Sequence, residues 1–274
     1  MALLDFSNNK IYIMGILNVT PDSFSDGGKF NSIDKALFQV EKMIKDGADI
    51  IDVGGESTKP FAEPITLQEE LDRVVPIIEK INKEFNTIIS IDTYKSLVAD
   101  ESLKNGAKII NDISGFTFDS QMEIIAKKHN ATCIIMHIKG TPKNMQIDPH
   151  YDNLILEIFN FLNNKVISLR NNGINDIIID VGFGFGKNLN DNYKLLKNLS
   201  YFTKIGCPIL AGISRKSMIG KLINIPPAER VAGTVSLNTI AILNGARLIR
   251  VHDVKENHQA VKTIEKYLEI DIVL

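Results

Sequence analysis

The chain has 274 residues, of which 44% are hydrophobic and 23% are charged. These are the proportions of an ordinary globular protein, and the length suits one large α/β domain better than two full domains. The formal net charge is −2, so the molecule has no overall positive field that would attract nucleic acid or an anionic membrane. We therefore predict neither of these partners, and an anionic substrate has to be bound by a local cluster of positive groups.

Two cysteines, Cys133 and Cys207, lie far apart and inside apolar runs. Their spacing suits no metal site, so the sequence predicts two buried, reduced thiols. The opening segment MALLDFSNNK has neither a long apolar core nor a cleavage site, and no stretch approaches about 18 uninterrupted apolar residues. The expectation is a cytoplasmic protein.

Short apolar runs alternate with longer helical patterns along the chain, which is typical of βα units and a parallel sheet. The predicted strands are Ile11–Leu17, Asp49–Val53, Ile88–Ile91, Lys108–Ile110, Thr132–Met136, Ile177–Ile179, Pro208–Ala211 and Arg247–Val251. The predicted helices are Ser32–Asp46, Thr66–Lys83, Tyr94–Asn105, Ser120–His129, Asn153–Asn172, Asp191–Leu199, Ala228–Asn244 and Glu256–Leu268. Several of these helices end in Asn-Gly or Asp-Gly, and glycine suits the left-handed turn that closes a helix. Because no linker divides the chain, we predict a single (β/α)8 TIM barrel domain over residues 1–274.

Polar or charged residues stand at the end of every predicted strand. They are Asn18; Asp52 and the segment from Glu56 to Lys59; Asp92; Asn111 and Asp112; His137; Asp180; Ser214 to Ser217; and Arg250 with His252. The carboxyl ends of the strands of a (β/α)8 barrel open on one face, where active sites form. A polar residue there can instead cap the next helix, and this alternative stays open for Asp112 and Ser214. Capping needs no Lys, Arg or His, so the whole set predicts an active site.

Eight segments resemble the signatures of dihydropteroate synthases, in family order and over nearly the whole chain. They are IYIMGILNVTPDSFSDGGKF at 11–30, DVGGEST at 52–58, SIDT at 90–93, INDISG at 110–115, MHIKGTP at 136–142, GFGFGK at 182–187, GISRKSMIG at 212–220 and RVHDV at 250–254. GFGFGK alone would be weak, and it fails as a phosphate loop because its glycines are too close and Asn188 replaces Ser or Thr. The resemblance implies a transferase of folate biosynthesis and sulfonamide target, usually a homodimer, that joins 6-hydroxymethyl-7,8-dihydropterin pyrophosphate to p-aminobenzoate.

The resemblance assigns Asp92, Asn111 and Asp180 to the polar edge of the pterin. A dihydropterin presents N–H and NH2 donors side by side, and a buried carboxylate can accept two of them. Lys216 matches a lysine that donates to the ring's carbonyl and N5. The walls around the ring would come from Ile113, Met136, Phe185 and Gly212. Core packing alone is the alternative for Ile113 and Met136.

The pyrophosphate end is assigned, by the same resemblance, to Asn18, Thr58, Arg250 and His252. Arginine presents a planar fork suited to phosphate oxygens, and His252 lies two residues beyond Arg250 and so points to the same face of the strand. A satisfied surface histidine is the alternative for His252. Asn18 matches the family's Mg²⁺ ligand, a hard oxygen donor suited to an ion held chiefly by water and phosphate.

The aminobenzoate pocket would be built from the first two loops and the start of the segment after Lys216. The matching residues are Phe24, Thr58, Lys59, Pro60 and Ser217, with Asp22 and Asp26 on the first loop. That loop is rich in Gly, Ser, Asp and Pro, as a mobile lid is, although an ordinary surface connection has the same composition.

Three positions depart from the family pattern. Lys59 stands where arginine is usual, Phe61 follows Pro60 where glycine is common, and Val181 follows Asp180 where proline is usual. Lysine keeps the positive charge and loses the bidentate fork of arginine. The first two departures lie in the second loop and bear on its contacts to pyrophosphate and aminobenzoate.

These assignments imply a dissociative substitution at the exocyclic CH2 of the pterin, in which pyrophosphate leaves before the arylamine attacks. Catalytic roles are implied for Lys216, Asp92, Asp180, Arg250 and His252. No protein nucleophile is needed, because nearby carboxylates favour the positive charge that develops on the ring. The alternatives are a methyltetrahydrofolate-type methyltransferase, which needs no pyrophosphate cluster, and a non-catalytic pterin-binding paralogue, which needs no intact residue set.

Overall fold

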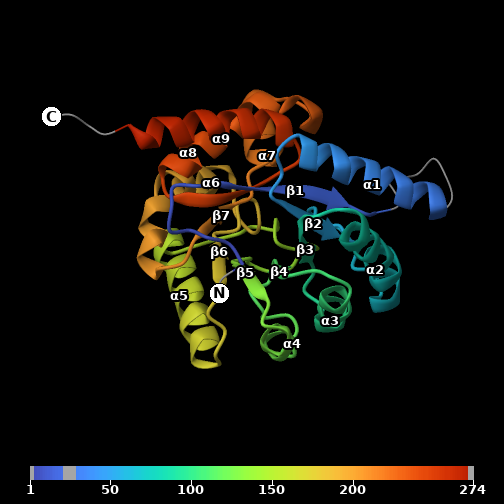
Figure 1. Cartoon of the computed structure of the whole chain (residues 1–274). Helices are drawn as coiled ribbons and strands as arrows, with labels where there is room; N and C mark the ends of the chain where they lie inside the picture. The colour runs from blue at the N-terminus through green and yellow to red at the C-terminus, as the bar shows by residue number, and fades with distance from the viewer. Residues whose placement is uncertain (1–2, 21–28, 271–274) are drawn as a thin grey trace.

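The computed structural model describes residues 3–20 and 29–270, without the side chains of residues 29–32. Its eight strands are parallel and form a closed barrel in chain order (Figure 1). They are β1 (Tyr12–Asn18), β2 (Ile50–Gly54), β3 (Ile88–Asp92), β4 (Ile109–Asp112), β5 (Thr132–Met136), β6 (Ile177–Asp180), β7 (Ile209–Ala211) and β8 (Ala246–Val251). The ring closes where β8 pairs with β1, as in the register pair Met14–Arg250. The predicted TIM barrel is confirmed.

Helices surround the barrel and cover the outer face of its strands (Figure 1). They are α1 (Lys29–Lys45), α2 (Leu67–Glu84), α3 (Ser96–Lys104), α4 (Met122–His129), α5 (Leu154–Asn171), α6 (Leu189–Lys197), α7 (Ser217–Ile223), α8 (Val231–Leu243) and α9 (Val254–Glu269). Two 3₁₀ helices, η2 (Leu199–Ile205) and η3 (Pro227–Glu229), lie after α6 and before α8. The eight predicted helices match α1 to α6, α8 and α9 to within a few residues.

Two elements were missed, and one predicted boundary was wrong. The segments α7 and η2 have seven residues each, which is too short for a clear period of 3.6. The predicted helix Ala228–Asn244 is in fact η3 followed by α8, because Arg230 between them has a φ of −85° and a ψ of 11° and interrupts the helix. The glycines that follow α1, α3, α5 and α8 have positive φ, as predicted from Asp-Gly and Asn-Gly; they are Gly47, Gly106, Gly173 and Gly245.

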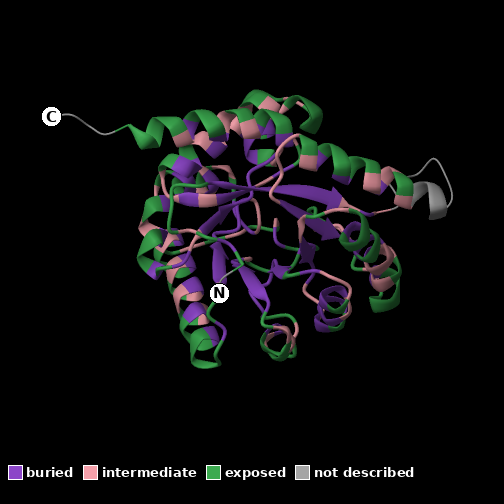
Figure 2. Cartoon of the chain, viewed as in Figure 1, coloured by how far each residue is buried: buried purple, intermediate pink, exposed green. Residues whose placement is uncertain are grey.

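Two layers of buried side chains fill the fold. One layer lies inside the barrel and the other lies between the strands and the helices, whose outer faces are exposed (Figure 2). The inner layer contains Ile50, Ile88, Ile109, Ile134, Ile178 and Leu248. Alternate residues of a strand point to the same face, so residues two or four positions beyond these also point inward. This parity places Asp92, Asn111, Met136, Asp180 and Arg250 at the carboxyl mouth of the barrel.

Both cysteines are buried and unpaired, as predicted. Among the helices described, none is both long and apolar enough to cross a membrane.

Candidate active site

Arg250 joins two buried carboxylates at the carboxyl end of the barrel. Its Nε donates to Oδ2 of Asp52 at 2.6 Å, and its Nη2 donates to Oδ2 of Asp92 at 2.6 Å. Asn111 donates from Nδ2 to the same oxygen of Asp52 at 3.0 Å. One hydrogen-bonded cluster therefore connects β2, β3, β4 and β8.

Within this cluster, Arg250 holds its proton more tightly than usual, and so does Asp92, whose negative charge is thereby disfavoured. Burial raises the pKa of Asp92 to about 7, because the attraction of Arg250 only partly offsets the loss of solvent and the repulsion of Asp52. Burial also opposes the charge of Arg250, but the two carboxylates raise the pKa of its guanidinium above the usual range. The guanidinium thus stays protonated between two carboxylates in a region of low dielectric.

A second charged pair lies across the mouth. Burial raises the pKa of Asp180, which Lys216 opposes, and burial lowers the pKa of Lys216 to about 8, which Asp180 opposes. A Cβ atom added at Gly212 would lie 3.5 Å from Oδ2 of Asp180 and 3.8 Å from Nζ of Lys216. Gly212 therefore leaves open the space between the two charges, where any side chain would intrude.

The glycine-rich loop after β6 holds Lys216 in place. The Nζ of Lys216 donates to the carbonyl oxygen of Phe183 and lies 4.5 Å from the centre of the Phe185 ring. At Gly182 the backbone has a φ of +72° and passes so close to His137 that a Cβ would lie 2.0 Å from its carbonyl oxygen. The motif GFGFGK therefore shapes a tight turn that presents an aromatic ring and a carbonyl oxygen to a lysine.

Lys187, the last residue of that motif, is buried beneath the loop. Its Nζ donates to the carbonyl oxygen of Phe185 at 2.9 Å and lies 3.1 Å from Nδ1 of His137. Burial lowers the pKa of Lys187 to about 7. Burial and the charge of Lys187 lower the pKa of His137 to about 2, so this imidazole is neutral. The pair links the end of β5 to the loop after β6.

The loops after β7 and β8 are joined to each other at the rim. Arg215 donates from Nε to Oδ2 of Asp253 at 2.8 Å, and Oγ of Ser214 lies 3.1 Å from Nδ1 of His252. The packing around His252, followed by the charges of Arg250 and Arg215, lowers the pKa of the exposed imidazole to about 4. Ser214 thus contacts a site residue, and helix capping is the wrong alternative for it.

The hydrogen bonds of Asp112 resemble those of a capping residue, the alternative that was left open for it. Its Oδ1 accepts from the backbone N–H of Ser114 at 2.6 Å, and its Oδ2 accepts from that of Phe116 at 3.2 Å. These bonds close the loop after β4. Asp112 therefore binds the backbone of its own loop, as a capping residue does.

The loop after β2, which contains Thr58, Lys59 and Pro60, is held in place through Glu56. Glu56 accepts from the hydroxyl of Tyr94 at 2.5 Å and from Nζ of Lys95 at 2.6 Å. Lys59 is exposed, and its charge contributes to the lowered pKa of His252. Phe61 has a φ of +65°, a left-handed conformation that costs a bulky residue energy and a glycine nothing. This geometry explains why glycine is common at that position in the family.

The structure brings most of the predicted residues to one mouth. Nine of them lie at the carboxyl end of a strand or at the start of the loop after it: Asn18, Asp92, Asn111, Ile113, Met136, Asp180, Gly212, Arg250 and His252. Thr58, Lys59 and Pro60 lie on the loop after β2, Phe185 and Lys216 face each other, and Ser217 begins α7. Asp22, Phe24 and Asp26 lie outside the described residues.

Three residues with contacts in this site received no individual role from the sequence. They are Asp52, Glu56 and Lys187. Asp52 lies two residues beyond Ile50 on β2 and so faces inward, and no sequence pattern indicates that its partners come from β4 and β8. Lys187 belongs to a recognised motif, and nothing in the motif indicates that its charge is buried.

The sequence profile described as pterin binding enzyme matches residues 14–252. The dihydropteroate synthase of Haemophilus influenzae is 45% identical over 265 residues, which cover 94% of this chain and 96% of that protein. The Yersinia pestis dihydropteroate synthase, solved with a sulfonamide drug complex, superposes with a TM-score of 0.91 at 44% identity and covers 98% of this chain and 100% of its own.

A third similar protein is the dihydropteroate synthase of Xanthomonas albilineans in complex with 7,8-dihydropteroate. It has a TM-score of 0.88 and 34% identity, over 98% of this chain and 97% of its own. Length, fold and sequence therefore agree over almost the entire chain. The chain belongs to the dihydropteroate synthase family of transferases.

Proposed function

We propose that this chain condenses 6-hydroxymethyl-7,8-dihydropterin pyrophosphate with p-aminobenzoate, giving 7,8-dihydropteroate and pyrophosphate in folate biosynthesis. The observation that carries the proposal is the pairing, across one barrel mouth, of buried acceptors on β3, β4 and β6 with the Lys216 ammonium group. The Xanthomonas relative binds 7,8-dihydropteroate, the product of this reaction, and supports the same assignment.

The pterin would lie flat in the mouth with its donor edge toward Asp92, Asn111 and Asp180. Charge-assisted hydrogen bonds to a buried carboxylate are short and strong, and the open space at Gly212 admits the ring between Asp180 and Lys216. Lys216 would then exchange the carbonyl of Phe183 for the ring's carbonyl and N5. Ile113, Met136 and Phe185 supply the walls, and the first two are 5% and 3% exposed.

The pyrophosphate would lie at the rim, against Arg250, His252, Thr58 and Lys59. Arg250 uses Nε and Nη2 for its carboxylate partners, which leaves the N–H groups of Nη1 for phosphate oxygens. His252, neutral at pH 7 because its pKa is lowered to about 4, donates one N–H without adding charge. The C–O bond of the CH2 group breaks first, and the electron pair leaves on pyrophosphate.

The cation that remains is spread over the pterin ring, where Asp92 and Asp180 favour positive charge. The nitrogen of p-aminobenzoate then forms the new C–N bond and loses its proton to solvent. No side chain forms a covalent bond with the substrate. The residues of this chain bind, orient and stabilise charge, which is why the catalytic set contains carboxylates, Lys216, Arg250 and His252 without a nucleophile.

Mg²⁺ is part of the proposal, with Asn18 as its protein ligand. A Cβ at Gly54 would lie 3.8 Å from Oδ1 of Asn18 and 3.6 Å from Oδ2 of Asp92, so these two oxygens flank the end of β2. Mg²⁺ prefers oxygen ligands and usually takes most of them from water and phosphate. The amide oxygen of Asn18 would therefore suffice as the protein ligand. The ion would offset the charge of the leaving group.

The aminobenzoate pocket is proposed between the first two loops and the start of α7. Phe24, Asp22 and Asp26 would cover it from the first loop, while Thr58, Lys59, Pro60 and Ser217 would line its other side. Sulfonamide drugs resemble p-aminobenzoate, and the Yersinia relative was solved with such a drug. Binding of a sulfonamide in competition with p-aminobenzoate is therefore expected.

We also propose that the chain forms a homodimer through α8. This helix buries Thr234, Asn238, Ala241 and Ile242, and it also carries apolar side chains on its outer face, where Ile240 and Leu243 are 42% and 51% exposed. Exposed apolar side chains on a surface helix support a partner surface there. A cytoplasmic location is proposed as well, because both cysteines are free and reduced thiols suit that compartment.

The proposal is tested by incubating the purified chain with the pterin pyrophosphate, p-aminobenzoate and Mg²⁺, and by measuring pyrophosphate release and 7,8-dihydropteroate. Equimolar appearance of both products is expected. A folded protein that binds the pterin and forms no dihydropteroate would contradict the proposal. Methyl transfer from methyltetrahydrofolate, assayed in parallel, would favour the methyltransferase alternative.

A further inference from the structure

Asp52 lies deeper in the barrel than the groups that are expected to touch the pterin. On β2 it is in register with Ser90, while Gly54, two residues further along, is in register with Asp92. Asp52 is fully buried. A side chain at this depth reaches a bound ligand only through the residues above it.

The Oδ2 atom of Asp52 accepts from two of those residues. Arg250 donates from Nε at 2.6 Å and Asn111 from Nδ2 at 3.0 Å. A carboxylate accepts hydrogen bonds and donates none, so it can bind only the NH2 end of the Asn111 amide. The carbonyl oxygen of Asn111 is the end left for a ligand. Without Asp52, the amide could present either end, because a flip exchanges donor and acceptor at nearly the same shape.

The same carboxylate fixes the fork of Arg250. Because Nε is bound to Asp52 and Nη2 to Asp92, the planar guanidinium is held at two edges and cannot swing away. Arg250 is thereby kept protonated beside the pterin edge and at the pyrophosphate end. Asp52 thus acts on both halves of the substrate site without lying in either.

Asp52 is not arranged for stability alone. Its Oδ1 and the hydroxyl of Ser90, its register partner, are buried and have no hydrogen-bond partner among the residues that the structure describes. Buried polar atoms are normally satisfied, and exceptions tend to occur at functional sites. A carboxylate retained here at such a cost has a role beyond packing.

We propose that Asp52 is a positioning residue that sets the hydrogen-bonding polarity of the pterin edge, by turning the Asn111 amide so that its oxygen faces the ligand. The inference deepens the proposed function and rests on it. With Asn111 so oriented, the edge formed with Asp92 and Asp180 consists of acceptors, and it selects a heterocycle that presents adjacent N–H and NH2 donors. A ring that presents acceptors there is rejected.

The test compares Asp52→Asn with Asp112→Asn as a matched control. Both residues are buried carboxylates, on β2 and at the end of β4, but the hydrogen-bond partners of Asp112 in the described part of the chain lie within its own loop. Affinity for 6-hydroxymethylpterin, which has no pyrophosphate, is measured by calorimetry, together with thermal stability. Asp52→Asn should weaken binding about tenfold or more, and Asp112→Asn should lower the melting temperature with little change in affinity.

A swap variant, Asp52→Asn with Asn111→Asp, supplies a readout that a structural role would not move. The new amide at 52 can donate to the new carboxylate at 111, which then offers only acceptors to the ligand. Pterin affinity should recover by at least half of the logarithmic loss. If Asp52→Asn fails to fold, the test compares the swap variant with Asn111→Asp alone. Both variants present acceptors at position 111 and differ only at position 52, so their pterin affinities should be similar.

Two results would overturn the inference. One is wild-type pterin affinity in Asp52→Asn, and the other is a loss no larger than that of Asp112→Asn without recovery in the swap. If the wild-type chain binds 6-hydroxymethylpterin but forms no dihydropteroate, the proposed function fails while the positioning role stands. Loss of pterin binding in the wild-type chain would remove both.

Discussion

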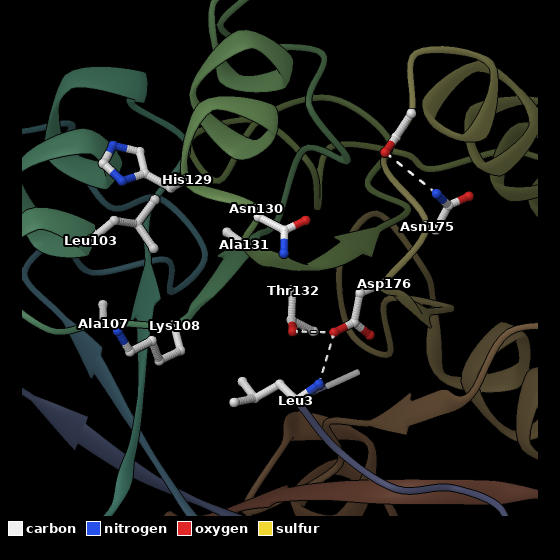
Figure 3. Close-up of a pocket in the computed structure, with 11 residues that line it drawn as sticks. Leu3, Leu103, Ala107, Lys108, His129, Asn130, Ala131, Thr132, Asn175 and Asp176 are labelled. Carbon is white, nitrogen blue, oxygen red and sulfur yellow. Dashed lines mark hydrogen bonds between the residues drawn. The ribbon is translucent and has the colours of Figure 1, made fainter. Parts of the chain in front are cut away.

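The two ends of the barrel differ in what their polar groups do. At the amino end, a cavity of about 480 Å³ lies between the starts of β4, β5 and β6 (Figure 3). Three of its lining residues bind one another: Asp176 accepts from Thr132 Oγ1 at 2.6 Å and from the backbone N–H of Leu3 at 3.3 Å. At the carboxyl end, Arg250, Lys216 and the carboxylates of Asp92 and Asp180 lie close together and have shifted pKa values.

This difference shows that the volume of a cavity does not locate the chemistry. Groups whose environment disturbs their protonation, and which still have hydrogen-bonding capacity for a ligand, are the better guide. The amino end contains hydrogen bonds of the kind that stabilise a fold. In (β/α)8 barrels the carboxyl end is also the face where active sites occur.

The largest effect is expected for Lys216→Met. The variant loses the ammonium group with the largest electrostatic effect on Asp180, and removal of a single positioned donor costs about 100-fold or more in kcat. Turnover is measured as pyrophosphate release. Lys221→Met is the control, because Lys221 lies on α7, the helix that follows Lys216, and is exposed. Near-normal turnover in a folded Lys216→Met protein would refute the assignment of the mouth.

The next effect is expected for Asp180→Asn, which turns a pure acceptor into a group with two donors opposite the donors of the pterin. An unpaired buried polar group costs about 1–3 kcal/mol, so the Kd for pterin should rise about 5- to 150-fold. Asp191→Asn is the control, since Asp191 only caps α6. Calorimetry that shows equal affinities in both variants would contradict the role.

Lys187→Met tests the effect of the buried Lys187 ammonium group on stability, apart from the residues that contact the substrate. The pKa of Lys187 falls from 10.5 to about 7 on folding, so between these values the unfolded chain binds more protons and wild-type stability rises with pH. Relative to Lys187→Met, the wild type should gain about 1 kcal/mol per pH unit from pH 7.5 to 9.5. Urea unfolding at several pH values measures this; a constant difference would mean that the ammonium group is not buried.

A smaller effect is expected at the rim. Lys59→Ala should lower kcat/KM for the pterin pyrophosphate by up to about fivefold, the range of an exposed ion pair. Lys59→Arg should preserve or improve it, because the fork holds phosphate better. Steady-state kinetics with both substrates varied decide this, with exposed Lys80→Ala as the control. Unchanged kcat and KM values in Lys59→Ala would mean that Lys59 does not bind the pyrophosphate and that Arg250 and His252 bind it alone.

The smallest kinetic effect is expected at the amino end. Thr132→Val removes the hydrogen bond to Asp176 and should lower the free energy of unfolding by about 1 kcal/mol. Both KM values and kcat should stay at wild-type levels. Any clear change in KM would break the contrast between the two ends, because it would couple the amino-end cavity to the mouth.

The sequence by itself determined the barrel and most of the mouth. Alternating apolar runs and glycine stops fixed the βα units, and the period of two along a strand fixed which strand-end residues face inward. Asp92, Asp180 and Arg250 were therefore predictable as neighbours, since parallel strands of one barrel end at one face. The left-handed φ of Phe61 was not predicted, because the sequence indicated only that a bulky residue stands where glycine is common in the family.

Only the tertiary structure decided which of these groups are partners. Asp52 and Arg250 are 198 residues apart, and no local pattern indicates that they share a hydrogen bond or that the same oxygen also holds Asn111. The burial of Lys187 depends on how the loop after β6 folds over the end of β5. Hydrogen bonds and desolvation act over a few ångströms, and distances of that size between remote segments exist only once the barrel has closed.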